Sequence, residues 1–353
     1  MSDRLEAILA EGVPGVCPAA VALIAVDGAV VASAAAGELV RYSDADFTLA
    51  GDRPPARRDS IFDLASISKL FTTAAILSLA EDGLLDLDEP VATWLPGRDA
   101  RITLRRLLTH TAGLQPIRRI DLELPDASPG TRMAAMIDTP VTAPVGGPYL
   151  YTDVGMIMAG RVAEVAGGAP LDALVAARVT GVLGLADTGY RPAELHRVAA
   201  TEWKPERPGP GCVRGEVHDE TSYALGGVAG HAGVFGTADD VLALGESLRL
   251  GGASPGGRPL LRRESVAEML RDQGAEGAPF RHGLGVRIGD PGIVGPLAGA
   301  FGHSGFTGTS LVVSPPHGLT VVLLTNAVHP VRGRDGLRAL RHAVAAEALR
   351  LAG

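Results

Sequence analysis

The feature that most limits how this chain can fold is the placement of its strand-like segments, which lie near the two ends and leave a long helical middle. Near the N-terminus, the runs AAVALIAV and AVVASAAAG flank Asp27-Gly28, a dipeptide typical of a two-residue hairpin turn. Strand-like runs return after residue 283 as GLGVRI, GTSLVVS and LTVVLLTN. The sequence therefore predicts an α+β fold, in which one antiparallel sheet is built from N- and C-terminal strands, is flanked by helices, and carries an inserted, mainly helical lobe.

The middle of the chain contains helical stretches separated by Gly- and Pro-rich loops. The clearest helix covers Leu64 to Glu81, which has no Gly or Pro and places Leu70, Ala74 and Leu77 on one stripe before Gly83 ends it. Further helices are expected at 4–10, 102–109, 131–137, 153–166, 170–181, 238–250 and 263–271, with a closing helix spaced by Leu337, Leu340, Val344 and Ala348. We assign residues 1–62 and 280–353 to the sheet lobe and 63–279 to the helical lobe, and expect the active site in the cleft between them.

Composition excludes several classes of function. The chain has 353 residues, 46% of them hydrophobic, and a formal net charge of -8, so it lacks the basic surface that nucleic-acid binding requires. Its only cysteines, Cys17 and Cys212, are too few for a disulfide framework. The acidic residues near the N-terminus argue against a secretory signal, and the longest apolar run is too short for a membrane span. We expect a cytoplasmic protein with no membrane partner, and leave its oligomeric state open.

The first chemical motif is the pair Ser66 and Lys69 in DLASISKLFT. A spacing of three puts both side chains on one face near the start of a helix. A serine hydroxyl needs a base before it becomes a good nucleophile, and a desolvated lysine can act as one, whereas arginine stays protonated. Ser-x-x-Lys arises by chance in many proteins, but this chain has only two lysines, Lys69 and Lys204, which makes a chance match less plausible here. Ser68, next to Lys69, is assigned no role.

Two later motifs add polar groups. Tyr151 stands where a Gly- and Pro-rich loop meets a helix, and its phenol could move protons if a cation such as Lys69 or His303 lay beside it. Neighbouring Tyr149 is interpreted as packing. His303 opens the run HSGFTG just before the strand GTSLVVS, and its glycines permit close approach to a ligand from an edge strand.

Together these motifs resemble the serine β-lactamase and penicillin-binding-protein superfamily. The resemblance covers nearly the whole chain and includes the phrases LDLDEPVATWLP, ITLRRLLTHTAGL and GGVAGHAGVFGTADDVLAL. These phrases are similar to the group that holds class C β-lactamases, D-alanyl-D-alanine carboxypeptidases and family VIII esterases. The resemblance implies the β-lactamase/transpeptidase-like fold.

The resemblance also implies roles for individual residues. Ser66 would be the acylated nucleophile, Lys69 its proton acceptor or electrostatic partner, and Tyr151 the group that moves protons to the leaving group and from water. His303 would take the first position of the Lys-or-His, Thr-or-Ser, Gly triplet. The oxyanion hole would consist of the backbone N–H groups of Ser66 and Phe306.

Three more positions are expected to contact the substrate, namely Asp153, Ser304 and Gly305. The sequence departs from the pattern at Asp153, where many members have asparagine, and at His303, where class C β-lactamases usually have lysine. An ionised Asp153 near Lys69 would raise the pKa of the lysine and favour Tyr151 as the working base.

Other motifs are weaker candidates. The segment 252–256 matches the G-x-S-x-G elbow around Ser254, but no strand precedes it. His218, Asp219 and His231 lack the spacing of a zinc site, so no metal is expected, although His231 could line the pocket. His110 is interpreted as structural.

The predicted reaction is attack by Ser66 on a carbonyl, formation of an acyl-enzyme, and release of the acyl group, with no cofactor. The leading hypothesis is an intracellular esterase or amidase acting on a small ester or amide, with weak hydrolysis of a lactam as a possible side activity. One alternative is an acyltransferase of secondary metabolism, in which an amine or alcohol replaces water. A second alternative is a sensor that is acylated without turnover.

Overall fold

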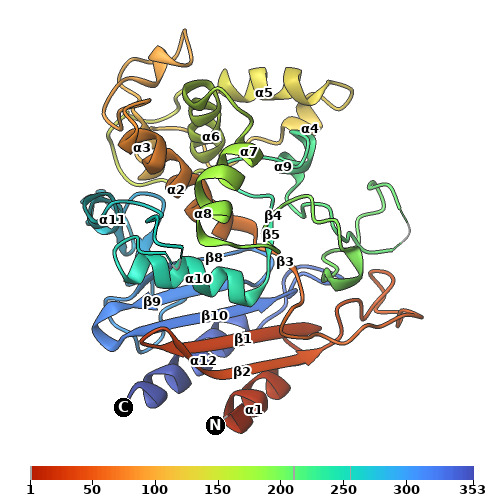
Figure 1. The fold of residues 1–353 in the computed structure, drawn as a ribbon. Coiled ribbons are helices and arrows are strands. Elements are labelled where there is room, and N and C mark those ends of the chain that lie inside the picture. Colours follow the sequence, from red (N-terminus) through yellow and green to blue (C-terminus); the bar gives the residue numbers. More distant parts are fainter. Residues whose placement is uncertain (1, 210, 255) are drawn as a thin grey trace.

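The computed structural model describes residues 2–209, 211–254 and 256–353. Its main element is a seven-stranded sheet in the order β2-β1-β10-β9-β8-β7-β6, in which every neighbouring pair is antiparallel (Figure 1). The strands come from the two ends of the described chain, as the sequence predicts. They are β1 (Ala19–Val26), β2 (Ala29–Gly37), β6 (Arg281–His282), β7 (Arg287–Ile288), β8 (Phe301–Ser304), β9 (Ser310–Ser314) and β10 (Leu319–Thr325).

Helices cover both faces of this sheet. The terminal helices α1 (Ser2–Gly12) and α12 (Leu337–Ala352) pack together on one face, and α10 (Ala238–Arg249) packs on β9 and β10 from the other (Figure 1). In β1, alternate residues belong to two separate hydrophobic clusters, with Val21 and Leu23 in one and Ala22 and Ile24 in the other. A strand buried on both faces is apolar throughout, which explains the unbroken run AAVALIAV.

The helical part is built around α2 (Ser68–Glu81), in which every residue from Ser68 to Leu79 is buried. A helix that is enclosed on all sides carries apolar residues on every face, and its buried polar residues, such as Ser68 and Lys69, need partners within the protein. Helices α6 (Asp153–Gly167) and α7 (Leu171–Val175) pack against it. The remaining helices of this part are α3 (Leu104–Leu108), α4 (Ile120–Glu123), α5 (Pro129–Ile137), α8 (Gly181–Leu183), α9 (Glu220–Ala224) and α11 (Arg263–Leu270).

A second, three-stranded sheet joins distant segments beside α2. Its strands are β3 (Phe62–Asp63), β5 (Val234–Gly236) and β4 (Gly189–Tyr190), with β5 in the centre. Strand β3 leads into the short 3₁₀ turn Ala65–Ile67 and then into α2. The sequence analysis missed this sheet because strands of two or three residues carry no readable periodicity.

The predicted α+β fold, with one antiparallel sheet built from N- and C-terminal strands and flanked by helices, is confirmed with local corrections. The expected helix over 170–181 is interrupted by a π turn at Ala176–Thr180, and the expected strand over 283–288 is reduced to β7. His303 lies within β8 rather than in a loop ahead of the strand. The strand formed by GTSLVVS is β9, which pairs with both β8 and β10, so the expectation of an edge strand there was wrong. The lobe boundaries at 62/63 and 279/280 stay a prediction.

Among the described residues, no single helix is long and apolar enough to cross a membrane; one pair, α6 with the segment Leu171–Leu183, reaches the required length only across a 77° bend. Both cysteines, Cys17 and Cys212, are free. The cytoplasmic placement stays a prediction.

The double-sided burial of β1 predicts where the fold is most sensitive to truncation. Leu23→Ala removes a side chain that is fully buried, so we expect the free energy of unfolding to fall by about 2–5 kcal/mol. Val30→Ala on the neighbouring strand β2 is the control, because Val30 is 37% exposed and should lose less than about 1 kcal/mol. Urea unfolding monitored by circular dichroism measures both, and equal losses would contradict the two-sided packing.

Candidate active site

Ser66 lies in the 3₁₀ turn that connects β3 to α2. It is the only residue from 61 to 70 that is not buried, so its hydroxyl is the polar group that this buried segment presents outward. The preceding residue, Ala65, has a φ of 47°, a left-handed conformation that costs energy for a residue with a side chain. Contacts with neighbouring segments must therefore hold this turn, because the backbone preference of alanine does not favour its conformation.

Lys69 follows one helical turn later and is fully buried. Its Nζ donates hydrogen bonds to Ser66 Oγ at 2.8 Å and to the backbone oxygen of His231 at 3.2 Å, and it forms an ion pair with Asp153 Oδ1 at 2.8 Å. Burial disfavours the charged ammonium and is the largest single influence, but the Asp153 carboxylate and the Tyr151 phenol together outweigh it and raise the pKa of Lys69 above its ordinary value. Lys69 is thus an ammonium at neutral pH, hydrogen-bonded to Ser66 and the His231 backbone and ion-paired with Asp153.

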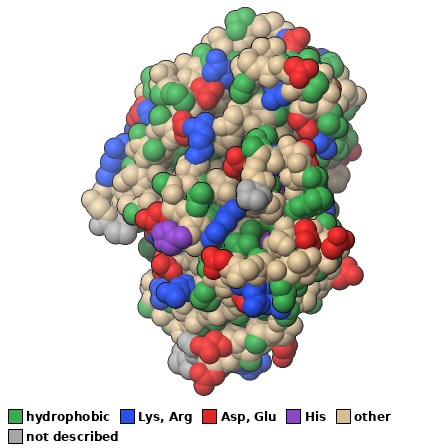
Figure 2. Space-filling view, turned by 90° about the vertical axis from the view of Figure 1, so that its right-hand side faces the viewer, with side chains coloured by type: hydrophobic (Ala, Val, Ile, Leu, Met, Phe, Trp, Pro, Cys, Tyr) green, Lys and Arg blue, Asp and Glu red, His purple; other side chains and the backbone are tan. Residues whose placement is uncertain are grey.

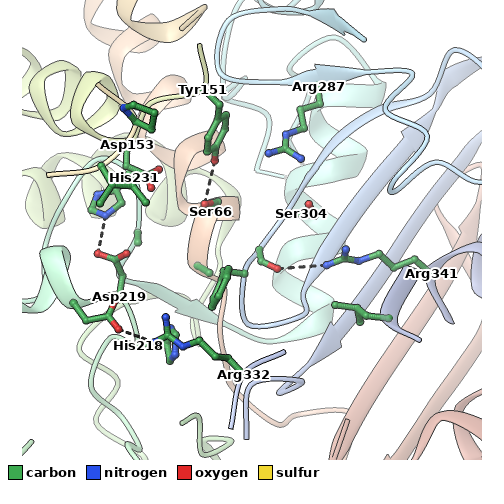
Figure 3. A pocket seen from close by; sticks show the side chains of 18 residues that line it. Ser66, Tyr151, Asp153, His218, Asp219, His231, Arg287, Ser304, Arg332 and Arg341 are labelled. Atoms are coloured by element: carbon green, nitrogen blue, oxygen red, sulfur yellow. Dashed lines mark hydrogen bonds and ion pairs between the residues drawn. The ribbon is translucent and has the colours of Figure 1, made fainter. Parts of the chain in front are cut away.

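Tyr151 approaches Ser66 from the loop before α6. Thr152 caps that helix by accepting the backbone N–H of Gly155 through its hydroxyl, which fixes where the helix begins and where Tyr151 points. The Tyr151 hydroxyl donates to Ser66 Oγ at 3.2 Å (Figure 3). Lys69 Nζ and the guanidinium of Arg287 each lie 5.0 Å from the centre of the Tyr151 ring. Two cations are therefore in place to stabilise negative charge on the phenol oxygen.

His303 is buried near Tyr151 and does not line the pocket. It is fully buried, its ring centre is 6.3 Å from that of Tyr151, and its Nδ1 is 2.8 Å from the backbone oxygen of Ser304. Burial, reinforced by the charges of Arg287 and Lys69, lowers the pKa of His303 well below its ordinary value. His303 is neutral, so it cannot be one of the cations expected beside Tyr151; Arg287, which the sequence analysis did not single out, takes that place.

These residues border a pocket of about 530 Å³. On the face seen in Figure 2, the surface is hollowed between the two parts of the molecule, with hydrophobic and basic side chains inside the hollow. Six of the predicted site residues line the pocket, whereas Lys69 and His303 are buried behind its wall: the six are Ser66, Tyr151, Asp153, Ser304, Gly305 and Phe306.

The turn between β8 and β9 brings the second expected oxyanion donor to this pocket. Gly305 N–H donates to the backbone oxygen of Thr309 at 2.8 Å, which closes the turn around Phe306. A Cβ at Gly305 would lie 2.5 Å from the backbone oxygen of Leu64, so only glycine lets this turn approach the nucleophile turn so closely. The two backbone N–H groups, at Ser66 and Phe306, thus border one pocket, and their role as an oxyanion hole stays a prediction.

Several pocket residues were missed or left open by the sequence analysis. Arg287, Arg332 and Arg341 line the pocket, as Figure 3 shows for the last two on the side opposite Tyr151, but thirty arginines in the sequence offered no means of selecting them. His231, left open as a pocket residue, lines it and bonds through Nε2 to Asp219 Oδ1 at 2.8 Å.

The side chains of the motifs judged weaker in the sequence, those of His218 and Ser254, contact other parts of the protein. His218 Nε2 lies 3.0 Å from Glu202 Oε2, and no group of three or more metal-binding side chains occurs in residues 2–209, 211–254 and 256–353. Ser254 donates to the backbone oxygen of Arg258, although part of its motif lies outside the described residues.

The residues interpreted as structural also have hydrogen-bond or packing partners. His110 accepts the backbone N–H of Thr152 at 3.1 Å, and Ser68 accepts that of Val234 at 3.1 Å. Tyr149 packs on His110, with ring centres 5.7 Å apart.

Comparison with known proteins places the chain in a family. The family model described as Beta-lactamase matches residues 5–346. A protein of Escherichia coli K12 named as a D-alanyl-D-alanine carboxypeptidase is 30% identical over 344 residues, covering 87% of this chain and 78% of that protein.

Solved structures agree over the same length. EstCE1, described as a hydrolase with promiscuous acyltransferase activity, has a TM-score of 0.74 at 26% identity and covers 97% of both chains. A penicillin-binding-protein homologue from Caulobacter crescentus has a TM-score of 0.72 at 21% identity over 98% of both chains, and the simvastatin synthase LovD from Aspergillus terreus has 0.74 at 21% identity over 99% of both; these two show the fold alone. The family model and the E. coli relative cover most of the chain, and on that basis the protein belongs to the Beta-lactamase family.

Proposed function

We propose that this protein is a serine hydrolase that forms an acyl-enzyme on Ser66 and acts on a small ester or amide. One observation carries the proposal: Ser66 Oγ, alone unburied in its segment, receives hydrogen bonds from both Lys69 and Tyr151 at the wall of a pocket. Packing alone gives no reason to place an ammonium, a phenol and a hydroxyl together, because removing polar and charged groups from water costs free energy that apolar side chains would not cost. Membership of the Beta-lactamase family agrees with a hydrolase.

The proposed reaction has two halves. In the first, the Tyr151 hydroxyl, which donates to Ser66 Oγ in the resting site, must give up its own proton to solvent before its oxygen can act as the base. Ser66 Oγ then forms a bond to the substrate carbonyl carbon, its proton passes to the Tyr151 oxygen, and the carbonyl oxygen becomes an oxyanion bound by the N–H groups of Ser66 and Phe306. The carbon–oxygen or carbon–nitrogen bond to the leaving group then breaks, and the leaving alcohol or amine takes the proton from Tyr151. In the second half, water attacks the acyl carbon and gives a proton to the Tyr151 oxygen. The bond between the acyl carbon and Ser66 Oγ then breaks, Ser66 Oγ takes that proton from Tyr151, and the acyl group is released as a carboxylic acid.

Tyr151, rather than Lys69, is the proposed base in both halves. An ammonium that already donates to Ser66 Oγ, and whose pKa is raised by Asp153, has no lone pair to accept a proton. Its contribution is electrostatic, since a positive charge beside Ser66 Oγ and the Tyr151 ring stabilises the anions that form there. The carboxylate of Asp153, which raises the pKa of Lys69, supports this assignment and disfavours a lysine that acts as the base.

The substrate class rests on the pocket. Its wall combines the apolar side chains of Ile117, Phe306 and Leu337 with polar groups, and its volume suits a small molecule. A β-lactam is a cyclic amide and would enter the same reaction, so weak lactam hydrolysis is a side activity of the proposed site.

Acyl transfer is the second candidate function. The pocket opens to solvent through the hollow of Figure 2, so an alcohol or amine could take the place of water at the acyl-enzyme. EstCE1, at 26% identity, is described as having promiscuous acyltransferase activity, which favours this alternative over a sensor without turnover.

The nucleophile is tested by covalent labelling. We expect a fluorophosphonate to modify Ser66, as located by peptide mapping, and Ser66→Ala to abolish labelling and lower kcat on p-nitrophenyl esters by at least about 10³-fold. Ser254→Ala is the control and should be labelled like the original protein. Label on Ser254 in place of Ser66 would overturn the mechanism.

The protonation state of Lys69 is tested by the pH dependence of kcat/KM. Asp153→Asn removes the carboxylate that raises the pKa of Lys69, so burial prevails and this pKa falls. Because the mechanism needs the ammonium, we expect the alkaline limb of the kcat/KM profile to move to lower pH by about one unit or more. Asp172→Asn, in α7 outside the pocket lining, is the matched control. An alkaline limb that stays in place would show that the charge of Lys69 is not required.

Product analysis separates hydrolysis from transfer. With p-nitrophenyl butyrate and a primary alcohol present, a hydrolase releases mainly butyric acid, whereas an acyltransferase releases mainly the new ester. We expect the acid to predominate, with continuous turnover. A single burst of p-nitrophenol equal to the enzyme concentration, followed by no further release, would instead identify the sensor.

A further inference from the structure

Behind the pocket lies a buried carboxylate to which the proposed reaction gives no role. Asp63, the second residue of β3, is 2% exposed, and it is not among the side chains that line the pocket in the described residues. A buried carboxylate is costly unless each oxygen has donors, so the partners of Asp63 indicate what it is retained for.

Its two side-chain oxygens hold backbone N–H groups from two distant segments. Oδ1 accepts from Ala65 N at 2.8 Å, and Oδ2 accepts from His218 N at 2.7 Å. The first bond stabilises the left-handed conformation of Ala65, the residue that immediately precedes Ser66. The direction in which the Ser66 N–H points depends on this turn.

The same residue reaches the other oxyanion donor by two routes. The backbone oxygen of Asp63 accepts from Thr307 Oγ1 at 2.8 Å, next to Phe306 in sequence. The second route passes through His218, whose ring stacks on the Phe306 ring with centres 5.7 Å apart and planes inclined by 25°. Phe306 itself is 59% exposed, so few other contacts fix its side chain.

We propose that Asp63 is a positioning residue for the oxyanion hole, which sets the distance between the N–H groups of Ser66 and Phe306 by binding both turns and the His218 segment at once. The proposal rests on the proposed function, because it concerns how that site stabilises its transition state. Donors that are held in advance contribute most to catalysis, since no reorganisation is needed when the oxyanion forms.

The test is Asp63→Asn, which keeps the shape of the side chain but replaces one acceptor with an NH₂ donor. Only one of the Ala65 and His218 N–H groups can then be accepted, and the other faces a donor. We expect kcat on p-nitrophenyl butyrate to fall by about 10- to 10³-fold while KM changes less than about 3-fold. The affinity for phenylboronic acid, whose tetrahedral adduct with Ser66 places an oxygen in the hole, should fall in parallel with kcat/KM.

The matched control is Asp240→Asn in α10. Asp240 is also a carboxylate that accepts a backbone N–H, from Asp187 at 3.1 Å, together with the Thr188 hydroxyl at 2.8 Å, and it lies outside the pocket lining. We expect this variant to lose stability but keep its kcat and its boronic acid affinity. Equal kcat and boronic acid affinity in Asp63→Asn and the original protein would overturn the proposal.

If Asp63→Asn does not fold, Thr307→Val tests the proposal instead. It removes the hydroxyl that donates to the backbone oxygen of Asp63, and we expect a smaller loss of kcat and boronic acid affinity. Thr307→Ser, which keeps the hydroxyl, should restore both. Full activity in Thr307→Val would then overturn the proposal. Failure of the proposed function itself looks different, because the original protein would neither turn over esters nor be labelled on Ser66.

Discussion

The ammonium of Lys69 is the constraint around which the pocket is arranged. A fully buried charge is tolerated only when it is paired and hydrogen-bonded, and the partners of Lys69 come from three separate parts of the chain: the nucleophile turn, the start of α6 and the loop before β5. Loss of any one of these partners leaves the buried charge with less compensation for its burial. The need to satisfy this charge therefore holds Ser66, Asp153 and the His231 segment in one place.

The two sheets and α2 make that arrangement rigid. Helix α2 is enclosed on all sides, and the small sheet fixes β3 beside β5, so the turn at Ala65 is defined from both ends. On the opposite side, Thr309 Oγ1 donates to the backbone oxygen of Leu64 at 3.0 Å, which connects the β8–β9 turn to the same segment. Buried hydrogen bonds therefore connect the elements on the two sides of the pocket. Exposed side chains such as Ile117 and Phe306 line the pocket itself.

Local patterns were sufficient to predict the elements with strong periodicity. The hairpin at Asp27-Gly28 and the apolar run of α2 follow from backbone preference and burial. The closeness of Tyr151 to Ser66 does not, because 85 residues separate them and only the family resemblance connected them. Strand β8 was missed because Gly302 and His303 have little intrinsic strand preference and become a strand only by pairing with β7 and β9. The neutral state of His303 depends on burial by distant residues, which no local pattern contains.

The central claim is that Lys69 carries a proton at working pH and leaves the role of base to Tyr151. The chain has only two lysines, so ¹⁵N-lysine labelling gives two Nζ resonances, and that of Lys69 is identified as the one displaced in Asp153→Asn. Titration of the original protein should show Lys69 as an ammonium at pH 7, with its transition above that of a free lysine. A Lys69 resonance that reports a neutral amine at pH 7 would contradict the account and make Lys69 the base.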